Sequence, residues 1–308
     1  MEYVIYKLDF ITPVHFGKND LAKSENTFMA DTLFSALCNE AVKYEDDTLD
    51  RLYQAFINRR LLISDAFPYI GDTYYLPKPI LRVENKESQG DSKIKKAYKK
   101  LNYIPADKID IYMEGKLNPQ DEEKRINTLG AFDMKISAVI EDGVATPYYI
   151  RQYSFNKGNG LYIIVGYEDE DDVYMIEELL EGLSYAGIGG RRSSGMGRFE
   201  LKRGKTKNSK VIFDRLAGSG ERKMTLSISL PREDEIHNAL DGARYVLLKR
   251  SGFAETYGGN AKPSRKKDIY MLKSGSCFQN KYDGDIYNVA TNQSHEVYKY
   301  GIPMWMEV

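Results

Sequence analysis

The segment Gly182–Phe199 has the sequence GLSYAGIGGRRSSGMGRF, with six glycines, three arginines and a pair of adjacent serines. Glycine lets the backbone adopt positive φ angles and lets another molecule approach the main chain closely. Arginine offers a planar fork of donors that suits phosphate groups. This segment, which we call the glycine-rich loop, is typical of a surface that binds a polyanion.

The elements on either side of the glycine-rich loop argue against a nucleotide cofactor. Apolar residues from Val173 to Leu183 recur at helical spacing, and a strand is indicated after Gly197, so the order is helix, glycine turn, strand. A dinucleotide fingerprint needs the order strand, glycine turn, helix. A Walker A loop needs Gly-x-x-x-x-Gly-Lys-Ser/Thr, and the Gly-Lys-Thr tripeptide at 204–206 has Phe199 in place of the first glycine. We therefore expect no cofactor.

Two interpretations of the glycine-rich loop remain open. In the first, main-chain N–H groups, the guanidinium groups of Arg191 and Arg192, and the hydroxyls of Ser193 and Ser194 follow a sugar–phosphate backbone and bind it in a salt-dependent manner. In the second, the glycines cap a helix and form a turn, and the arginines are merely solvated.

Composition narrows the class of protein. The chain has 308 residues, enough for two domains, and its net charge of −1 does not by itself indicate a nucleic-acid partner. Its two cysteines, Cys38 and Cys277, lie far apart, so we expect a reducing cytoplasm rather than a disulfide scaffold. No apolar run reaches the roughly 18 residues that span a membrane. The acidic run Glu168–Asp172 complements a helix N-terminus, which explains it without a metal.

Apolar periodicity predicts strands and helices in both halves of the chain. In the first half these are a strand at 3–11, helices at 29–44 (with Asp31 as N-cap) and from Thr48, and strands at 61–64, 73–76, 132–140, 148–155 and 161–167. In the second half they are strands at 224–230, 245–250, 269–273, 284–288 and 297–308, and a helix at 232–240. This succession predicts two α+β units with antiparallel sheets, divided between residues 205 and 222.

Positive charge is concentrated in three segments. Residues 93–100 hold five lysines, within a polar region at 84–147 that is either a solvated insertion or a projecting arm that touches nucleic acid. Residues 191–223 hold eleven Lys or Arg residues against three acids. The glycine- and lysine-rich segment 257–267 follows a strand with a basic end. These positions suggest that a polyanion would contact both halves.

Several short motifs bring the chain close to a known family. They are Tyr3–Leu8, Thr12–Gly17 (TPVHFG), Asp31–Leu37 (DTLFSAL), Leu76–Pro79 (LPKP), Lys249–Phe253 (KRSGF), Gly275–Phe278 (GSCF) and Val297–Gly301 (VYKYG). With the glycine-rich loop, they resemble the RAMP proteins of CRISPR systems. In that family the loop follows the last helix of a ferredoxin-like (RRM-like) domain. The resemblance covers nearly the full length, apart from 84–147 and 205–222. It is greatest to the type III-A (Csm) effector subunit that caps the 5′ end of the crRNA.

The resemblance implies a fold and a set of partners. The fold would be α+β, with a ferredoxin-like domain at 1–210, a thumb-like insertion in it at 84–147, and a second ferredoxin-like domain at 211–308. The chain would hold the 5′ repeat-derived tag of the crRNA. It would also contact the large polymerase-type subunit and the first copy of the backbone RAMP subunit. The thumb would wedge a base of the tag and separate it from the guide segment.

The resemblance also implies a set of RNA-binding residues. In the glycine-rich loop they are Gly187, Gly189, Gly190, Arg191, Arg192, Ser193 and Ser194, and elsewhere they are His15, Lys249, Arg250 and Ser251.

Catalysis is the alternative to a purely binding role. Some RAMP proteins are endoribonucleases that mature the precursor RNA, and acid–base cleavage needs a group that titrates near neutrality beside the 2′-OH. Of the three histidines, His237 is expected on an exposed helix and His295 in a polar loop, which leaves His15 without an evident partner. We therefore predict a non-catalytic crRNA-binding subunit. The alternatives are a crRNA-maturing endoribonuclease that uses His15, and a protein-only scaffold whose basic loops meet an acidic partner.

Overall fold

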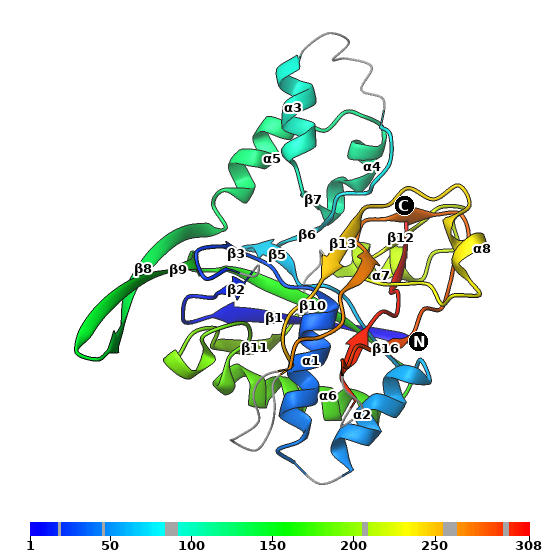
Figure 1. Ribbon diagram of the computed structural model, residues 1–308. Coiled ribbons are helices and arrows are strands. Elements are labelled where there is room, and N and C mark those ends of the chain that lie inside the picture. Colours follow the sequence, from blue (N-terminus) through cyan, green and yellow to red (C-terminus); the bar gives the residue numbers. More distant parts are fainter. Residues whose placement is uncertain (18–19, 45–46, 84–91, 205–208, 255–263, 292–295) are drawn as a thin grey trace.

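The computed structural model describes residues 1–17, 20–44, 47–83, 92–204, 209–254, 264–291 and 296–308 (Figure 1). Its central sheet has seven strands. Their order is β11 (Phe199–Arg203), β1 (Glu2–Phe10), β10 (Asn159–Tyr167), β5 (Phe67–Ile70), β6 (Thr73–Pro77) and β7 (Tyr103–Pro105), with β4 (Leu61–Ile63) also paired with β10. Every pairing in the sheet is antiparallel, which confirms the α+β class with antiparallel sheets.

The central sheet is buried on both faces because its strands carry apolar residues in alternation. On β1, Val4, Tyr6 and Leu8 belong to one apolar core, and Ile5 belongs to a second core on the opposite face. The pairing of β1 with β10 runs in register from Glu2 opposite Tyr167 to Leu8 opposite Leu161.

Three helices cover one face of the sheet (Figure 1). They are α1 (Ala30–Ala41), α2 (Thr48–Ile57) and α6 (Glu170–Ala186), as the apolar periodicity predicted. The Asp169 side chain caps α6 by accepting the Asp171 N–H (3.0 Å), and Asp172 pairs with Arg60 (2.7 Å). The acidic run therefore has structural partners.

The predicted cap of α1 was wrong. Met29, not Asp31, is the N-cap residue, and it contributes no side-chain cap. The Ala30 N–H donates to Oδ1 of Asp65 (2.8 Å). Asp31 lies one residue inside the helix, and its carboxylate contacts Arg250 (2.8 Å) and Lys299 (2.9 Å). The start of α1 is thus fixed by residues distant in sequence, and capping rules that consider only neighbouring residues cannot predict it.

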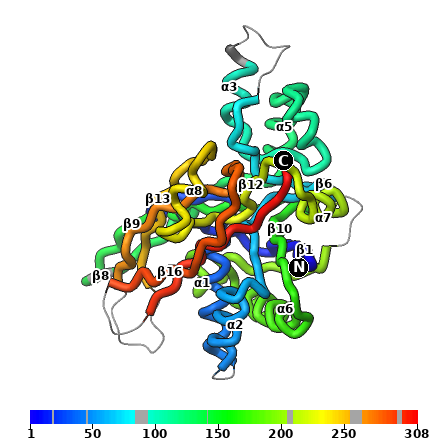
Figure 2. The backbone as a smooth tube through the Cα atoms, turned by 90° about the vertical axis from the view of Figure 1, so that its right-hand side faces the viewer, coloured from blue at the N-terminus to red at the C-terminus, as the bar shows by residue number. Residues whose placement is uncertain are grey.

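The C-terminal half packs against the other face of the sheet and also reaches the helices. Its elements are α7 (Ser209–Leu216), β12 (Lys223–Thr225), α8 (Ile236–Leu240), β13 (Leu247–Arg250), β14 (Ile269–Leu272), β15 (Cys277–Phe278), β16 (Ile286–Asn288), β17 (Tyr298–Tyr300) and β18 (Trp305–Glu307). Figure 2 shows them between α3 and α5 at the top and α2 and α6 at the bottom. Both large cores contain residues of both halves.

The C-terminal strands differ from the prediction in length and grouping. They form three small sheets, β15-β12-β18, β13-β14 and β16-β17, rather than one larger sheet in the described residues. The strand expected at 297–308 is divided into β17 and β18 by residues 301–304. The boundary segment contains α7, whose Ile212 and Leu216 are buried in the second core. Because only two apolar side chains anchor this helix, its apolar periodicity is too short to be detected in the sequence.

The insertion forms two projections rather than one (Figure 1). Helix α3 (Ser92–Lys100), the 3₁₀ turn η1 (Ala106–Lys108), α4 (Ile109–Met113) and α5 (Pro119–Ile126) make up the first. The second is a long hairpin of β8 (Gly130–Glu141) and β9 (Val144–Phe155), which extends beyond the predicted limit at 147. A short pair, β2 (Phe16–Gly17) and β3 (Ser24–Glu25), lies at its base. No helix among the described residues is long and apolar enough to cross a membrane.

Asp65 ties α1 to the C-terminal half. Its Oδ1 accepts the N–H groups of Ala30 (2.8 Å) and Ile228 (2.9 Å), and the side chain is 4% exposed. Burial raises the pKa of the Asp65 carboxyl to about 6, although the hydrogen bonds from Ala30, Ile228 and Ser274 act in the opposite direction. The Asp65 carboxyl therefore stays protonated to a higher pH than an exposed aspartate does.

We expect Asp65→Asn to stabilise the protein at neutral pH. Asparagine keeps the accepting oxygen but does not ionise. Because the pKa is raised in the folded state, the stability associated with the neutral carboxyl is complete below about pH 4 and is lost as the pH rises through about 6. Urea unfolding should therefore show the variant more stable than wild type by about 1–3 kcal/mol near pH 7.5. The two proteins should converge near pH 4. A variant that is less stable than wild type at both pH values would contradict this.

Candidate nucleic-acid interface

The glycine-rich loop begins where α6 ends. Gly187 is the C-cap residue, with φ 82°, and its N–H donates to the Leu183 carbonyl oxygen (2.7 Å). A 3₁₀ turn, η2 (Arg192–Ser194), follows, and its preceding residue Arg191 has φ 61°. A left-handed conformation is uncommon for a non-glycine residue. The loop is therefore held in a defined and partly strained shape between α6 and β11.

Gly189 is required by a close approach. Its φ is 98°, and a Cβ at this position would lie 2.8 Å from the His15 carbonyl oxygen and 2.9 Å from the Phe16 ring. The next residue, Gly190, donates its N–H to the same carbonyl oxygen (2.8 Å). The loop thus packs directly on the segment that contains His15.

His15 lies beneath the loop. Its side chain is 4% exposed, and Nδ1 donates to the carbonyl oxygen of Arg151 in β9 (2.7 Å). It is absent from the described residues that line the groove introduced below. The imidazole thus supports the loop and the base of the hairpin, and direct RNA contact by His15 stays a prediction.

A groove of about 650 Å³ lies between the glycine-rich loop, α1 and the C-terminal half. The loop contributes Ile188, Gly189, Gly190 and Arg192, and the end of β13 with the residues after it contributes Leu248, Lys249, Arg250, Ser251 and Phe253. Residues from the two predicted RNA-binding segments therefore meet in one groove, although about 60 positions separate them in the chain. Of the segment 257–267, residues 257–263 lie outside the described residues.

Six cationic side chains line the groove against two carboxylates, Glu25 and Asp31. The cations are Arg192, Lys249, Arg250, Lys266, Lys273 and Lys299. This excess of positive charge suits an anionic ligand.

A buried ion triad forms the floor between α1 and the C-terminal half. The Arg250 guanidinium makes a two-pronged contact with Asp31 (2.8 and 2.9 Å), and the Lys299 ammonium contacts the same carboxylate (2.9 Å). Burial alone would raise the pKa of Asp31, but the two cations prevail and lower it to about 2. Arg250 therefore serves first as an internal ion partner.

The other predicted residues differ in where their polar groups lie. Lys249 pairs with Asp268 (2.8 Å) at the surface. The Arg191 guanidinium lies over the Tyr148 ring of β9 (5.2 Å), whereas Arg192 faces the groove. The Ser194 hydroxyl donates to the Arg191 carbonyl oxygen (2.8 Å), and Ser193 is exposed. Arg191 thus links the loop to the hairpin, and Arg192 is placed to meet a ligand.

The sequence matches two family models that together cover most of the chain. Residues 7–200 match the RAMP superfamily, and residues 218–308 match the CRISPR Csm4 C-terminal domain. The CRISPR system Cms protein Csm4 of Mycobacterium tuberculosis is 33% identical over 304 residues, covering 98% of this chain and 96% of the relative. The chain belongs to the Csm4 family of RAMP proteins. The Csm4 protein of Streptococcus thermophilus is 31% identical over 320 residues, covering 100% of this chain and 99% of the relative.

Solved structures share the fold of this Csm4-family chain. The Csm3–Csm4 subcomplex of a type III-A interference complex aligns with a TM-score of 0.66 and 20% identity, covering 100% of this chain and 99% of the other. A Csm1–Csm4 cassette in complex with pppApA aligns with a TM-score of 0.63 and 23% identity, covering 99% and 97%.

The hairpin of this Csm4-family chain carries an apolar face that the sequence analysis missed. Met134 (45% exposed), Ile136 (65%) and Ile140 (75%) share one face of β8, and Ile136 lies opposite the exposed Tyr149. An Asp-Gly turn between alternating apolar runs predicts such a hairpin, and Asp142 (φ 50°) and Gly143 (φ 78°) form it. The hairpin base pairs Val14 with Tyr153, which places it beside the glycine-rich loop.

Proposed function

We propose that this chain is the non-catalytic crRNA-binding subunit of a type III-A CRISPR interference complex. In this role it holds the 5′ repeat-derived tag and joins the large polymerase-type subunit to the backbone RAMP subunits. The observation that carries the proposal is the single basic groove shared by the glycine-rich loop and the end of β13. Family membership supports the type of complex, since the relatives are Csm4 proteins.

Different residue types of the groove and loop would make different contacts with the RNA. The main chain at Gly189 and Gly190 lets a sugar–phosphate backbone approach, whereas the buried Gly187 would act only by shaping the loop, and Arg192 and Lys249 supply charge for phosphates. Ser193 and Ser251 offer hydroxyls, whereas Ser194 and Arg250 act mainly by holding the loop and the triad. The exposed Phe253 ring (65%) gives a surface on which a base can stack.

The hairpin β8–β9 fits the role of the thumb. Its exposed apolar face is suited to insertion beside unstacked bases, and its base is fixed to the glycine-rich loop through Arg191 and Val14. The strand order β11-β1-β10-β4 with α1 and α6 on one face supports a ferredoxin-like unit in residues 1–210. We propose residues 211–308 as the second unit, which is docked through a shared core.

Two partners follow from solved relatives. Structures of Csm4 chains contain Csm3 in one case and Csm1 in another. By analogy we assign this chain a backbone subunit of the Csm3 type and a large subunit of the Csm1 type as neighbours. Such a position, in contact with both, is what capping the 5′ end of the guide requires.

The test is a double substitution in the loop, Arg191→Ala with Arg192→Ala. We expect weaker binding of tag-bearing RNA in the assembled complex, and a slope of log affinity against log salt that falls in magnitude by up to about 1.4, at roughly 0.7 per lost phosphate contact. Titration of labelled tag RNA at several salt concentrations measures both. The matched control, Arg51→Ala with Arg222→Ala, removes two exposed arginines outside the groove and should change neither. Unchanged affinity in the loop variant would overturn the assignment.

The endoribonuclease alternative rests on His15. Its imidazole is buried, and its Nδ1 is committed to a carbonyl oxygen, so it lacks access to a scissile 2′-OH. Metal-independent cleavage of repeat RNA that disappears in His15→Ala, with the fold intact, would favour that alternative over ours.

A further inference from the structure

The helical projection presents lysines that the proposed tag groove does not use. On α3, Ala97 is 7% exposed and Tyr98 packs against the second core, so these side chains face inward. Lys95, Lys96 and Lys99 are exposed on the opposite side. Among the described contacts of α3, the one ion pair is between Lys100 and Glu123 (3.8 Å). The solvent side of α3 therefore carries a net positive charge.

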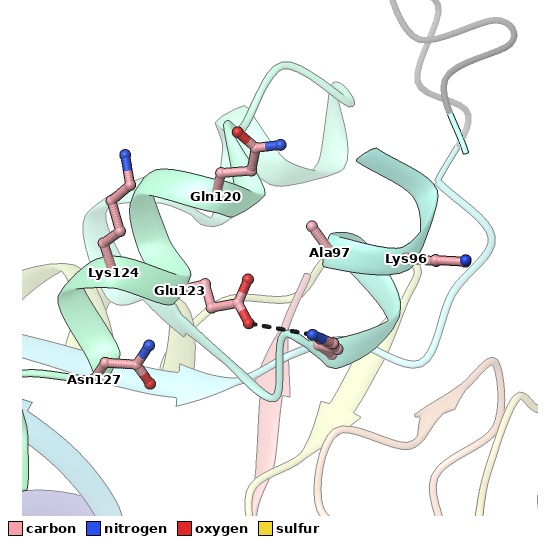
Figure 3. A pocket seen from close by; sticks show the side chains of 7 residues that line it. Lys96, Ala97, Gln120, Glu123, Lys124 and Asn127 are labelled. Atoms are coloured by element: carbon pink, nitrogen blue, oxygen red, sulfur yellow. Dashed lines mark ion pairs between the residues drawn. The ribbon is translucent and has the colours of Figure 1, made fainter. Parts of the chain in front are cut away.

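A shallow depression of about 450 Å³ lies between α3 and α5 (Figure 3). Its lining includes Lys96, Lys100 and Lys124, with the amides of Gln120 and Asn127, against the single carboxylate of Glu123. In Figure 3 the Lys96 and Lys124 side chains point away from the ion pair, and the Lys124 ammonium lies 3.7 Å from the Asp121 carboxylate. Amides and ammonium groups at the rim of an open depression suit a phosphodiester chain better than an enclosed small molecule.

Lys78 lies between the end of α3 and Asn102, a residue of the groove. Its ammonium donates to the Tyr98 carbonyl oxygen at the end of α3 (2.6 Å), and its N–H donates to the Asn102 carbonyl oxygen (2.9 Å). Asn102 also lines the groove, as does Lys273. Burial, and then the nearby Lys273 charge, lower the pKa of Lys78. Positive groups thus continue from the groove to the start of the helical projection.

The composition of this surface distinguishes RNA from a protein partner. Lysine is depleted at protein–protein interfaces, where buried aromatic and apolar residues provide most of the affinity. The aromatic residue of α3, Tyr98, is half-buried and turned inward, and the exposed side offers flexible ammonium groups. Such groups bind phosphates without sequence preference and with strong salt dependence.

We propose that α3 and α5 form a second phosphate-binding surface, which holds an unpaired RNA strand at the edge of the tag groove. This inference rests on the proposed function, because it extends the path of RNA held in that groove. The strand is either a continuation of the tag RNA itself or the unpaired flank of a target RNA that lies opposite the tag. Both sources present the same sugar–phosphate chemistry.

The test compares three proteins on three RNAs. The proteins are wild type, Lys95→Gln/Lys96→Gln/Lys99→Gln, and the groove variant Arg192→Ala/Lys249→Ala. Glutamine matches lysine in helix propensity, so α3 should persist. The RNAs are the tag alone, the tag with an oligouridine extension, and a guide paired with a target RNA that has an unpaired flank. We expect the lysine variant to bind the tag alone like wild type. On at least one longer RNA it should bind more weakly, with a salt slope reduced by about 2, at roughly 0.7 per lysine.

The outcomes separate this inference from the tag-binding proposal. Loss on the extended tag identifies the guide strand, and loss on the flanked target identifies the target strand. A matched control, Lys157→Gln/Lys210→Gln/Lys281→Gln, removes equal charge from exposed sites elsewhere and should leave all three affinities unchanged. If the lysine variant equals wild type on every RNA, or affects only assembly with a protein subunit, the inference is wrong. Loss of tag binding in the groove variant would still support the tag groove.

Discussion

Asp31→Ala should lower the free energy of unfolding by about 3–5 kcal/mol, which is the usual cost of removing one member of a buried ion group. The Asp31 side chain is fully buried, Lys299 is 9% exposed and Arg250 is 26% exposed. Without the carboxylate, the Lys299 ammonium would remain in an apolar setting with its counter-charge lost. Urea unfolding of the purified chain or the assembled complex measures the change.

Two further variants isolate the cause. In Asp31→Ala/Lys299→Met the stranded cation is removed, and we expect much of the stability to return. Asp268→Ala breaks the surface pair with Lys249, whose side chain is 49% exposed, and should change stability by less than about 1 kcal/mol. A loss in Asp31→Ala as small as that in Asp268→Ala would show that the triad is not a structural lock.

Acid titration gives an independent check on the triad. The pKa of Asp31 is depressed to about 2 in the folded protein, so its stabilising contribution is complete above about pH 4 and is lost as the pH falls toward 2. Wild type should therefore lose stability over this window more steeply than Asp31→Ala. The opposite order of steepness would contradict the assigned ion partners.

The sequence predicted elements with strong periodicity and missed those defined by distant contacts. Strand β1 and helices α1 and α6 carry long apolar patterns, so their existence followed directly, although α1 ends at Ala41 rather than at 44. Helix α7 has a short pattern, and its burial depends on packing against β18, which no local window contains. The N-cap of α1 was misassigned for the same reason, since the Asp31 carboxylate forms ion pairs with residues more than 200 positions away.

The candidate site shows the same division. The glycine-rich loop was recognisable from sequence because glycines indicate an unusual backbone conformation and arginines indicate affinity for phosphate. Lys273 and Lys299 are isolated in sequence; in the fold Lys273 follows β14, Lys299 lies in β17, which packs on α1, and both line the groove. His15 looked chemically suggestive, but a lone histidine carries no information about burial, and the fold places it under the loop.

Gly189→Ala should disrupt the glycine-rich loop and, with it, RNA binding. An alanine at φ 98° is strained by about 1–2 kcal/mol, and its Cβ would approach the His15 carbonyl oxygen to 2.8 Å. Overpacking of this kind typically costs a further 1–3 kcal/mol, so we expect a total loss of about 2–5 kcal/mol in loop stability. Because the clash is with backbone, a side-chain rotation cannot relieve it, and the loop must shift relative to the His15 segment.

Gly195→Ala is the matched control for Gly189→Ala. Gly195 also has a positive φ (83°), but a Cβ there meets nothing within 4 Å. It therefore isolates conformational strain from the clash, and should cost only about 1–2 kcal/mol. Titration of tag-bearing RNA should show a loss of more than tenfold for Gly189→Ala and a much smaller loss for Gly195→Ala. Hydrogen exchange at the Gly190 N–H, which donates to His15, should accelerate in the first variant more than in the second. Equal losses in both variants would mean that strain alone, and not the contact with the His15 segment, fixes the loop beside the groove.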